Sequence, residues 1–222
     1  MAGRIAYYGG IVKDGLVLDL DAAKLDSYPK AGTVWNDVSD FRNNGILTNG
    51  STFNSENGGS IVFDGVDDYV DCGNGSSLNI TGDLSVSIWI KTTGVSGNHV
   101  IFAKHSLPSN IANYEGYLKG TAIYWWDGAA ERSTGLTVSS NIWNNITYVR
   151  SSSLVTAYIN YSVSGSVGVI SQGPVSGNLT IGKDQNSQNF QGNIATVHIY
   201  NKALSSSEVL QNFNAIKGRY GL

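Results

Sequence analysis

Short segments that alternate apolar and polar residues recur along this chain about every dozen residues, and glycine, asparagine or serine separates them. The clearest segments are residues 15–21, 59–65, 84–90, 142–150 and 155–160. Alternation with a period of two is the pattern of a strand that buries one face. Strands at this spacing, without intervening helices, indicate a sandwich rather than βαβ units. We therefore predict an all-β fold, a two-sheet antiparallel β-sandwich of the jelly-roll type. We expect its core to include Phe63, Trp89, Ile101, Val149 and Val197.

The end of the chain predicts one helix. Residues 192–200 alternate as a last strand. Ser205 and Glu208 then form a capping box, in which each side chain satisfies a free backbone N–H at a helix start. The apolar residues that follow share one helical face: Val209, Phe213 and Ile216. With Gly218 as the expected C-cap, we predict one short amphipathic C-terminal helix in a chain with almost no other helical pattern.

The length of 222 residues fits a single sandwich domain. Residues 15–222 form the predicted domain. Residues 1–14 lack clear periodicity, and we expect them to form an N-terminal arm. This arm either packs on a neighbouring molecule or lies on the surface of its own domain.

The chain carries few charges, 14% of its residues, and its net charge is -3. This gives no electrostatic reason to bind nucleic acid or an anionic membrane, since both need clustered lysine and arginine. Cys72 is the only cysteine, so no intrachain disulfide can form. No apolar run approaches the roughly 20 residues of a membrane span, and the N-terminus lacks the apolar segment of a signal peptide. We expect a soluble protein that reaches any surface by assembly or by a non-standard export route.

Aromatic residues gather in one part of the sequence: Tyr114, Tyr117, Tyr124, Trp125 and Trp126. Aromatic faces stack on sugar rings, and short polar side chains such as Asp127 then bond the hydroxyls. Alternation along a strand cannot bury both Trp125 and Trp126, so we expect one of them to face away from the core. An edge contact, a loop lid or a subunit interface remains the alternative, because Trp and Tyr are also enriched at interfaces. The predicted ligand-binding residues are Tyr114, Tyr117, Trp125, Trp126, Asp127 and Lys183.

Asp64, Asp67 and Asp68 are the candidate metal ligands, with Asp71 close by. Ca²⁺ takes six to eight oxygen ligands, and clustered carboxylates can supply several of them. Two observations favour a purely structural role instead. Alternation would place Asp67 and Asp71 on one strand face and Asp68 on the other, and Asp64 with the following glycine is ordinary turn chemistry. No cofactor is therefore expected, and Ca²⁺ remains the open alternative.

Catalysis finds little support in the sequence. Glycoside hydrolysis needs a pair of carboxylates that flank the bond. Glu56, Glu115 and Glu131 are scattered along the chain, and Glu208 belongs to the helix cap. The three histidines are not spaced as a metal-binding set. We therefore expect a protein that is not an enzyme.

Four stretches resemble the concanavalin A-like jelly-roll superfamily, and specifically its laminin-G-like branch. They are the hairpin at residues 62–70, the strand at 84–91, the strand at 143–149 and the ending at 181–208. The ending is the most specific of them, although the segment at 194–197 lacks an acidic pair that relatives carry. The catalytic relatives of this fold place their carboxylates on one strand as Glu-x-Asp-x-Glu, and this chain has no such run. The resemblance also implies that the polar loop 183–189 rims a ligand-binding edge; a solvated connector is the alternative.

A narrower resemblance lies near the two ends of the chain. Residues 15–22, 27–29, 35–39 and 212–222 look like stand-alone domains in structural proteins of tailed bacteriophages. This implies a non-enzymatic virion protein, such as a capsid decoration, head-fibre or tail accessory protein. Its implied partners are other virion proteins and further copies of itself, and repetition would let weak glycan contacts add through avidity. The alternative function is a carbohydrate-binding module or a receptor-recognition lectin.

Overall fold

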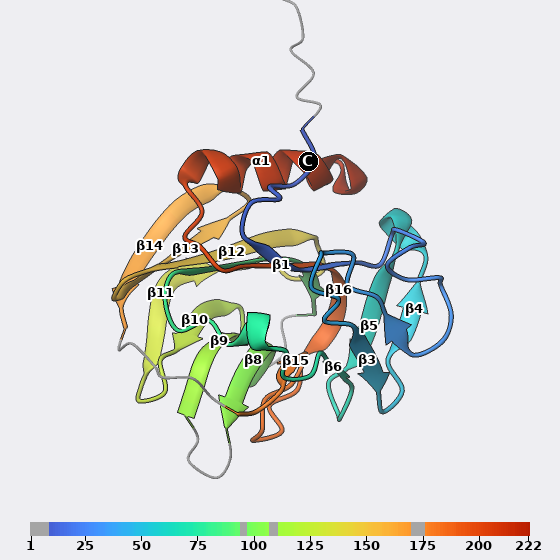
Figure 1. The fold of residues 1–222 in the computed structure, drawn as a ribbon, viewed down its shortest axis with the longest axis horizontal. Coiled ribbons are helices and arrows are strands. Elements are labelled where there is room, and N and C mark those ends of the chain that lie inside the picture. The colour runs from blue at the N-terminus through green and yellow to red at the C-terminus, as the bar shows by residue number, and fades with distance from the viewer. Residues whose placement is uncertain (1–8, 94–96, 107–110, 170–175) are drawn as a thin grey trace, which may run out of the picture.

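The computed structural model describes residues 9–93, 97–106, 111–169 and 176–222, and it shows two antiparallel sheets stacked as a sandwich (Figure 1). Sheet A has the order β14-β13-β12-β7-β16-β5-β4, with β1 paired to β16. Its strands are β1 (Leu16–Asp21), β4 (Thr52–Asn54), β5 (Ser60–Asp64), β7 (Leu84–Thr92), β12 (Asn144–Ser151), β13 (Leu154–Ile159), β14 (Ser162–Gly168) and β16 (Gln191–Tyr200). The predicted fold class is confirmed.

Sheet B has the order β11-β10-β9-β8-β15-β6-β3-β2. Its strands are β2 (Val34–Trp35), β3 (Gly45–Thr48), β6 (Tyr69–Asp71), β8 (Asn98–Ser106), β9 (Ile111–Lys119), β10 (Ala122–Trp126), β11 (Glu131–Thr137) and β15 (Leu179–Ile181). Strands β8 to β11 are sequential antiparallel neighbours, whereas β15 returns from far along the chain to pair with both β6 and β8. This return is what places the loop after β15 beside the β8–β11 region.

The main core lies between the sheets and contains, among others, Phe63, Ile101 and Val197, as the sequence predicts. The inward residues alternate with outward ones along most strands, which is the pattern that the sequence showed. Trp89 and Val149 are also buried, but they belong to a second apolar cluster on the outer face of sheet A. Their placement in the main core was therefore wrong. Alternation predicts which side chains point away from the main core. It cannot show whether another element covers the outer face on which they lie.

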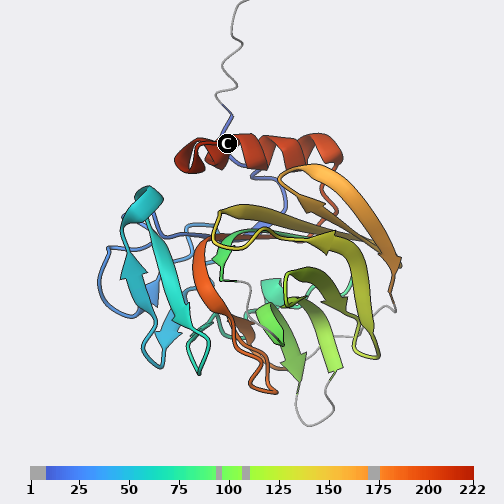
Figure 2. The ribbon, with the colours of Figure 1, turned by 180° about the vertical axis from the view of Figure 1, so that it is seen from behind.

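The cover over the outer face of sheet A is α1 (Ser206–Ile216), which continues into the 3₁₀ helix η3 (Lys217–Tyr220). It lies across sheet A, on the side away from sheet B (Figures 1 and 2). The capping box is confirmed: the Ser205 side chain accepts the Glu208 N–H, and Glu208 accepts the Ser205 N–H. The predicted C-cap at Gly218 is wrong, because the chain continues through η3 and turns left-handed at Gly221.

The apolar face of α1 packs with outward residues of sheet A and with the segment before β1. The members of this second cluster are Ile11, Val12, Leu16, Trp89, Val149, Tyr158, Ala195, Tyr200, Leu204, Val209, Phe213 and Ile216. The Trp89 ring stacks between Phe213 and Tyr220, with ring centroids 5.6 and 4.4 Å away. In the predicted N-terminal arm, residues 1–8 lie outside the described part of the chain. The Val12 N–H of the remaining segment donates to Asn212 of α1 at 2.8 Å.

A buried ion pair ties η3 to β1. Arg219 donates two hydrogen bonds to the carboxylate of Asp21, at 2.7 and 2.6 Å, and Asp21 is almost fully buried. Burial by itself raises the pKa of Asp21, but the hydrogen bonds and charge of Arg219, with the charge of Lys24, hold that pKa below its usual range. The pair therefore fixes the end of the chain only while the carboxylate is ionised. Among the described helices none is long and apolar enough to cross a lipid bilayer.

Candidate ligand-binding site

The outer face of sheet B carries a row of residues that crosses the strands at right angles. Each residue pairs directly with the next one across seven adjacent strands. In order from β3 to β11 the row is Ile46, Asp71, Thr180, Ala103, Glu115, Trp126 and Glu131. Because strands lie about 4.8 Å apart, this transverse row extends roughly 29 Å. The neighbours of these residues along the strands, such as Leu47, Val70 and Trp125, face the core.

One end of the transverse row opens into a small cavity of about 110 Å³, called here the aromatic pocket. It is lined by Asn98, His105, Glu115, Tyr117, Trp126, Glu131, Asp184, Asn186 and Gln188. Tyr117 stacks on Tyr124 with ring centroids 5.4 Å apart, and both pack with Trp126 in an apolar group separate from the core. The sheet thus presents a rigid aromatic platform beside hydrogen-bonding side chains.

Two glutamates of the aromatic pocket flank Trp126, because Glu115 and Glu131 are its direct partners on the strands to either side. Glu115 is buried and bonded to the Nε2 atom of His105. Burial raises the pKa of Glu115, the nearby His105 opposes this, and the negative charge of Asp184 adds to it. Glu131 is partly exposed and accepts a hydrogen bond from Lys119 Nζ at 2.9 Å, which lowers the pKa of Glu131.

The loop after β15 forms the rest of the aromatic pocket. Asp184 is buried and accepts the backbone N–H groups of Asn186 and Gln188 at 2.9 and 2.8 Å, so its carboxylate folds the loop upon itself. This brings the side chains of Asn186 and Gln188 over the platform. The loop 183–189 and the aromatic group, which the sequence gives as two separate candidates, therefore meet in one pocket.

The structure separates the predicted aromatic ligand residues. Tyr117 and Trp126 line the aromatic pocket, whereas Tyr114 and Trp125 are 0% and 2% exposed and belong to the main core. Tyr114 also donates its hydroxyl to the Leu78 carbonyl at 3.0 Å. Since side chains alternate along β9 and β10, Tyr114 and Trp125 face the core, whereas Tyr117, Tyr124 and Trp126 face outward. Tyr114 and Trp125 are therefore removed from the candidate site.

Asp127 is also removed from the candidate site. It is buried, and its carboxylate accepts the N–H groups of Ala129 and Ala130 at 3.0 and 2.8 Å. It also accepts a hydrogen bond from Arg132 Nε at 2.7 Å. These bonds shape the turn between β10 and β11, so the residue positions Glu131 rather than a ligand.

Lys183 lies in a second cavity, of about 330 Å³, called here the central pocket. Its ammonium is 4.7 Å from the centre of the Tyr69 ring. The central pocket shares His105 and Asp184 with the aromatic pocket. Its lining is Tyr69, Asp71, His105, Asn178, Thr180, Lys183, Asp184, Gln185 and Ser187.

A third cavity, of about 550 Å³, continues from the central pocket toward β3 and is called here the open groove. The two share Asp71 and Asn178. Its lining is Arg42, Asn43, Asn44, Ile46, Thr48, Asp71, Cys72, Gly73, Asn74, Gly75 and Asn178. The three cavities together follow the transverse row from Glu131 to Ile46.

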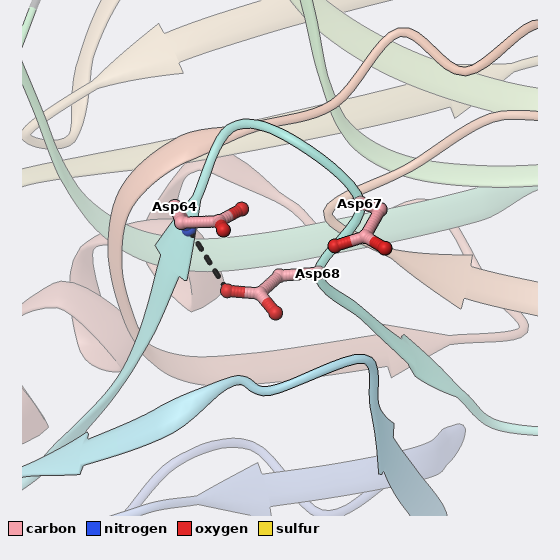
Figure 3. A group of neighbouring side chains, drawn as sticks. All are labelled: Asp64, Asp67 and Asp68. Atoms are coloured by element: carbon pink, nitrogen blue, oxygen red, sulfur yellow. Dashed lines mark hydrogen bonds between the residues drawn. The ribbon is translucent and has the colours of Figure 1, made fainter.

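The candidate metal ligands Asp64, Asp67 and Asp68 come together in the turn between β5 and β6, with one oxygen of each within 4.8 Å of the others (Figure 3). The expected separation of Asp67 and Asp68 on opposite strand faces is wrong, because β6 begins only at Tyr69. Asp68 accepts the Asp64 N–H at 2.9 Å, and Asp64 accepts the Val66 N–H at 2.7 Å. Three carboxylates at this spacing fit part of the oxygen shell of Ca²⁺. The turn is also held without a cation, so Ca²⁺ binding stays a prediction.

Sequence reasoning missed Glu115 and Glu131 as site residues, whereas Asp184 lies in the loop 183–189 that it named as a candidate. Glu115 and Glu131 looked scattered because neither alternation nor a known motif links them. Their common neighbour Trp126 follows from the register of two successive hairpins. The signal available in the sequence was the glycine turn between β9 and β10, which sets Glu115 opposite Trp126 once the hairpin is recognised.

Comparison with known proteins gives one family. The family described as the concanavalin A-like lectin/glucanases superfamily, Laminin_G_3, matches residues 64–210. No curated protein matches the sequence significantly.

Solved structures with the same fold include three of informative kinds. The binding domain of Paraclostridial Mosquitocidal Protein 1 has a TM-score of 0.73 and 20% identity, over 91% of this chain and 52% of that one. The binding domain of Botulinum Neurotoxin DC in complex with SialylT has a TM-score of 0.69 and 14% identity, over 92% and 52%. A Trypanosoma rangeli sialidase has a TM-score of 0.70 and 16% identity, over 92% and 33%. This chain therefore spans about half the length of the two binding domains, and at these identities the likeness concerns the fold.

Proposed function

This chain belongs to the concanavalin A-like lectin/glucanases superfamily, and we propose that it is a non-catalytic domain that binds a glycan along the transverse row of sheet B. The observation that carries this proposal is the continuity of three cavities along that row, with an aromatic platform at one end. An elongated ligand can lie across several strands there and contact all three cavities.

The chemistry of the three cavities along the transverse row suits a sugar. A pyranose presents apolar C–H faces and a rim of hydroxyls, so it needs an exposed ring to stack on and neutral groups that both donate and accept. Trp126 and Tyr124 supply partly exposed rings. Amide side chains, which donate and accept at once, line each cavity: Asn98, Asn186 and Gln188 in the aromatic pocket, Asn178 and Gln185 in the central pocket, and Asn43, Asn44 and Asn74 in the open groove.

The way in which the two glutamates are held supports binding without turnover. A general acid and a base or nucleophile must both be free to reach the bond that breaks. Glu115 is tied to His105, and Glu131 is tied to Lys119. Incubation of the protein with its tightest glycan and analysis of the products should show no cleavage. Cleavage that disappears in Glu115→Gln would overturn the non-catalytic part of the proposal.

Binding itself is tested with a glycan array, followed by calorimetry on the strongest ligands. The Trp126→Ala variant should lose at least about fivefold in affinity, since stacking on an aromatic ring contributes on the order of 1–3 kcal/mol in comparable contacts. Trp143→Ala is the matched control, because Trp143 packs on Tyr220 under the helical cover of sheet A, far from the groove. An array without any bound glycan, or equal losses in the two variants, would contradict the proposal.

The fold relatives supply independent support. One of them was solved in complex with SialylT, and for another, cell entry of botulinum neurotoxin type C is dependent upon interaction with two ganglioside molecules. Those properties belong to the relatives. They make glycan recognition a natural first test for a domain of this fold with an open, polar and aromatic face.

A structural role in a phage particle is the second candidate, and it is favoured by where the phage-like stretches lie. Three of them join at β1: Ser27 accepts the Asp21 N–H, Asp37 accepts the Asp19 N–H, and Arg219 of the C-terminal stretch binds Asp21. The four similar stretches thus form one connected unit around β1. Mass spectrometry of purified particles should find the protein in stoichiometric amounts, in the company of other virion proteins and as repeated copies. Its absence from the particles would exclude this role and leave glycan binding untouched.

A further inference from the structure

We propose that the aromatic pocket selects a protonated amine, so that the preferred ligand is an amine-bearing sugar rather than a sialylated one. This inference rests on the proposed glycan binding and specifies its ligand class. It follows from the charges, the rings and the size of the aromatic pocket.

The charge of the aromatic pocket is negative. Three carboxylates line it, those of Glu115, Glu131 and Asp184. Their ion-pair partners among the described residues are Lys119, bound to Glu131, and His105, bonded to Glu115. Burial and the negative charge of Asp184 raise the pKa of Glu115, and His105, which is bonded to Glu115, opposes this. An ammonium group placed among them would gain charge-assisted hydrogen bonds, and a carboxylate would meet repulsion.

The rings of the pocket also favour a cation. An ammonium group is attracted to the face of a Trp or Tyr ring within about 6 Å of its centre. Trp126 stands between the two glutamates in the transverse row, so a group held by both carboxylates lies over or beside that ring. The chain already shows the same contact at the rim, where Lys119 Nζ is bound to Glu131 and lies 5.9 Å from the centre of the Tyr124 ring.

The size and free polar atoms of the pocket fit a substituent rather than a whole oligosaccharide. A cavity of about 110 Å³ holds on the order of four water molecules, enough for an amino group and the carbon that carries it. His105 is 2% exposed, and its Nδ1 atom has no hydrogen-bond partner among the described residues, nor does Trp126 Nε1. The adjoining central pocket, which shares His105 and Asp184, has room for the ring that bears the amine.

Anionic sugars of the kind bound by a fold relative would be disfavoured here. One of the neurotoxin binding domains was solved in complex with SialylT, and sialic acid carries a carboxylate. In this chain such a carboxylate would enter a pocket that is lined by three other carboxylates, which would repel it. A likeness of fold therefore does not extend to the ligand class.

Calorimetry with two matched ligand pairs tests the inference. The first pair is a glucosamine tetrasaccharide and its fully N-acetylated counterpart, measured below the pKa of the sugar amine. The second pair is sialyllactose and lactose. We expect the amine ligand to bind roughly tenfold more tightly than its acetylated counterpart, as for a charge-assisted hydrogen bond, and sialyllactose to bind more weakly than lactose.

Variants show whether the pocket is responsible. Glu131→Gln removes a partly exposed charge at the rim of the pocket, so the fold should tolerate it, and it should abolish the preference for the amine while leaving the acetylated ligand bound. Glu56→Gln makes the same change of charge at an exposed site in the 3₁₀ helix before β5 and should change neither ligand. Raising the pH above the pKa of the sugar amine should likewise erase the preference in the unchanged protein.

The outcomes separate this inference from the proposed function. Equal affinities for the amine ligand and its N-acetylated counterpart would overturn the inference, and so would tighter binding of sialyllactose than of lactose. Both results would leave the proposed glycan binding intact. Loss of both ligands together in Glu131→Gln would also overturn it, since the residue would then act on the shape of the site. A protein that binds no glycan at all would overturn both.

Discussion

The two sheets of this sandwich have outer faces of opposite character. On sheet A, α1 with η3 covers that face and seals an apolar and aromatic cluster, together with buried polar groups such as the Asp21–Arg219 pair, into a second core. On sheet B the outer face remains open, and its residues form the transverse row with three cavities. The closed face stabilises the fold, and the open face carries the proposed ligand site.

Two tryptophans make the comparison concrete. Trp89 and Trp126 each project away from the main core on a strand inside its sheet. Trp89 is 1% exposed because the rings of Phe213 and Tyr220 lie on it. Trp126 has no such cover and lines the aromatic pocket. The same residue type thus has a packing role on one face and a candidate contact role on the other.

The largest expected effect is on the sealed face. Trp89→Ala should lower the free energy of unfolding by about 3–5 kcal/mol, because it removes a buried ring between two others and leaves a cavity. Urea unfolding followed by circular dichroism measures this. A loss below about 1 kcal/mol would show that the helical cover does not act as a second core.

Breaking the ion pair that attaches η3 should have the next largest effect. Arg219→Ala leaves the buried Asp21 without its main partner and should cost about 3 kcal/mol at pH 7. The pKa of Asp21 is lowered by folding, so the pair stabilises the protein above the unfolded pKa of about 3.9 and loses that effect as the pH falls below it.

The gap in stability between the unchanged protein and Arg219→Ala should therefore narrow as the pH falls from about 5 to 3. Thermal unfolding over that range measures the gap. A gap that stays constant would mean that Asp21 is not ionised in the folded protein.

Removing the helix cap is a smaller perturbation of the same face. Ser205→Ala deletes one half of the capping box and should destabilise the protein by about 1 kcal/mol, since the Glu208 N–H loses its acceptor. Ser205→Asp, which keeps an acceptor at that position, is the control and should stay within a few tenths of a kcal/mol. Chemical unfolding measures the stability of both variants. Equal losses would show that the hydroxyl group of Ser205 matters rather than an acceptor at that position.

The smallest effect on stability belongs to the open face. Trp126→Ala should cost about 1 kcal/mol or less, because its ring is only partly buried and leaves space that solvent can enter. Measured beside Trp89→Ala in the same unfolding experiment, it compares one substitution on two faces. Equal costs at both positions would remove the distinction between a sealed and an open sheet.

The elements of this fold were accessible from the sequence, because alternation marks strands and a capping box marks a helix start. Residues 84–90 and the helix at 206–216 are examples, and both were predicted near their observed bounds. The short edge strands β2 and β4 were not predicted, since two or three residues carry no periodicity. The sequence also did not predict which outer face of the two sheets another element covers. Nothing in the pattern around Trp89 or Trp126 says which one another element covers.

The candidate site depended on register, which the sequence does not state. The transverse row takes one residue from each of seven strands, and apart from those on the consecutive strands β8 to β11 its members lie far apart in the sequence. The loop candidate at 183–189 came from the family resemblance, and the aromatic candidate from its composition. Their union required the long return of β15 to the side of β8, which arises from tertiary pairing.

The position of the helical cover determines how the domain is oriented when one of its ends is attached to an anchor. Gly10 receives a hydrogen bond from Gln211 of α1, and the chain ends after η3, so the first described residues and the C-terminus lie together on the helical side (Figure 1). The transverse row and its three cavities, on the outer face of sheet B, are on the opposite side of the sandwich. A tether joined at either end would therefore hold the domain with its helix toward the anchor and its groove toward the surrounding medium. Immobilisation through a tag at either terminus should accordingly give the same orientation.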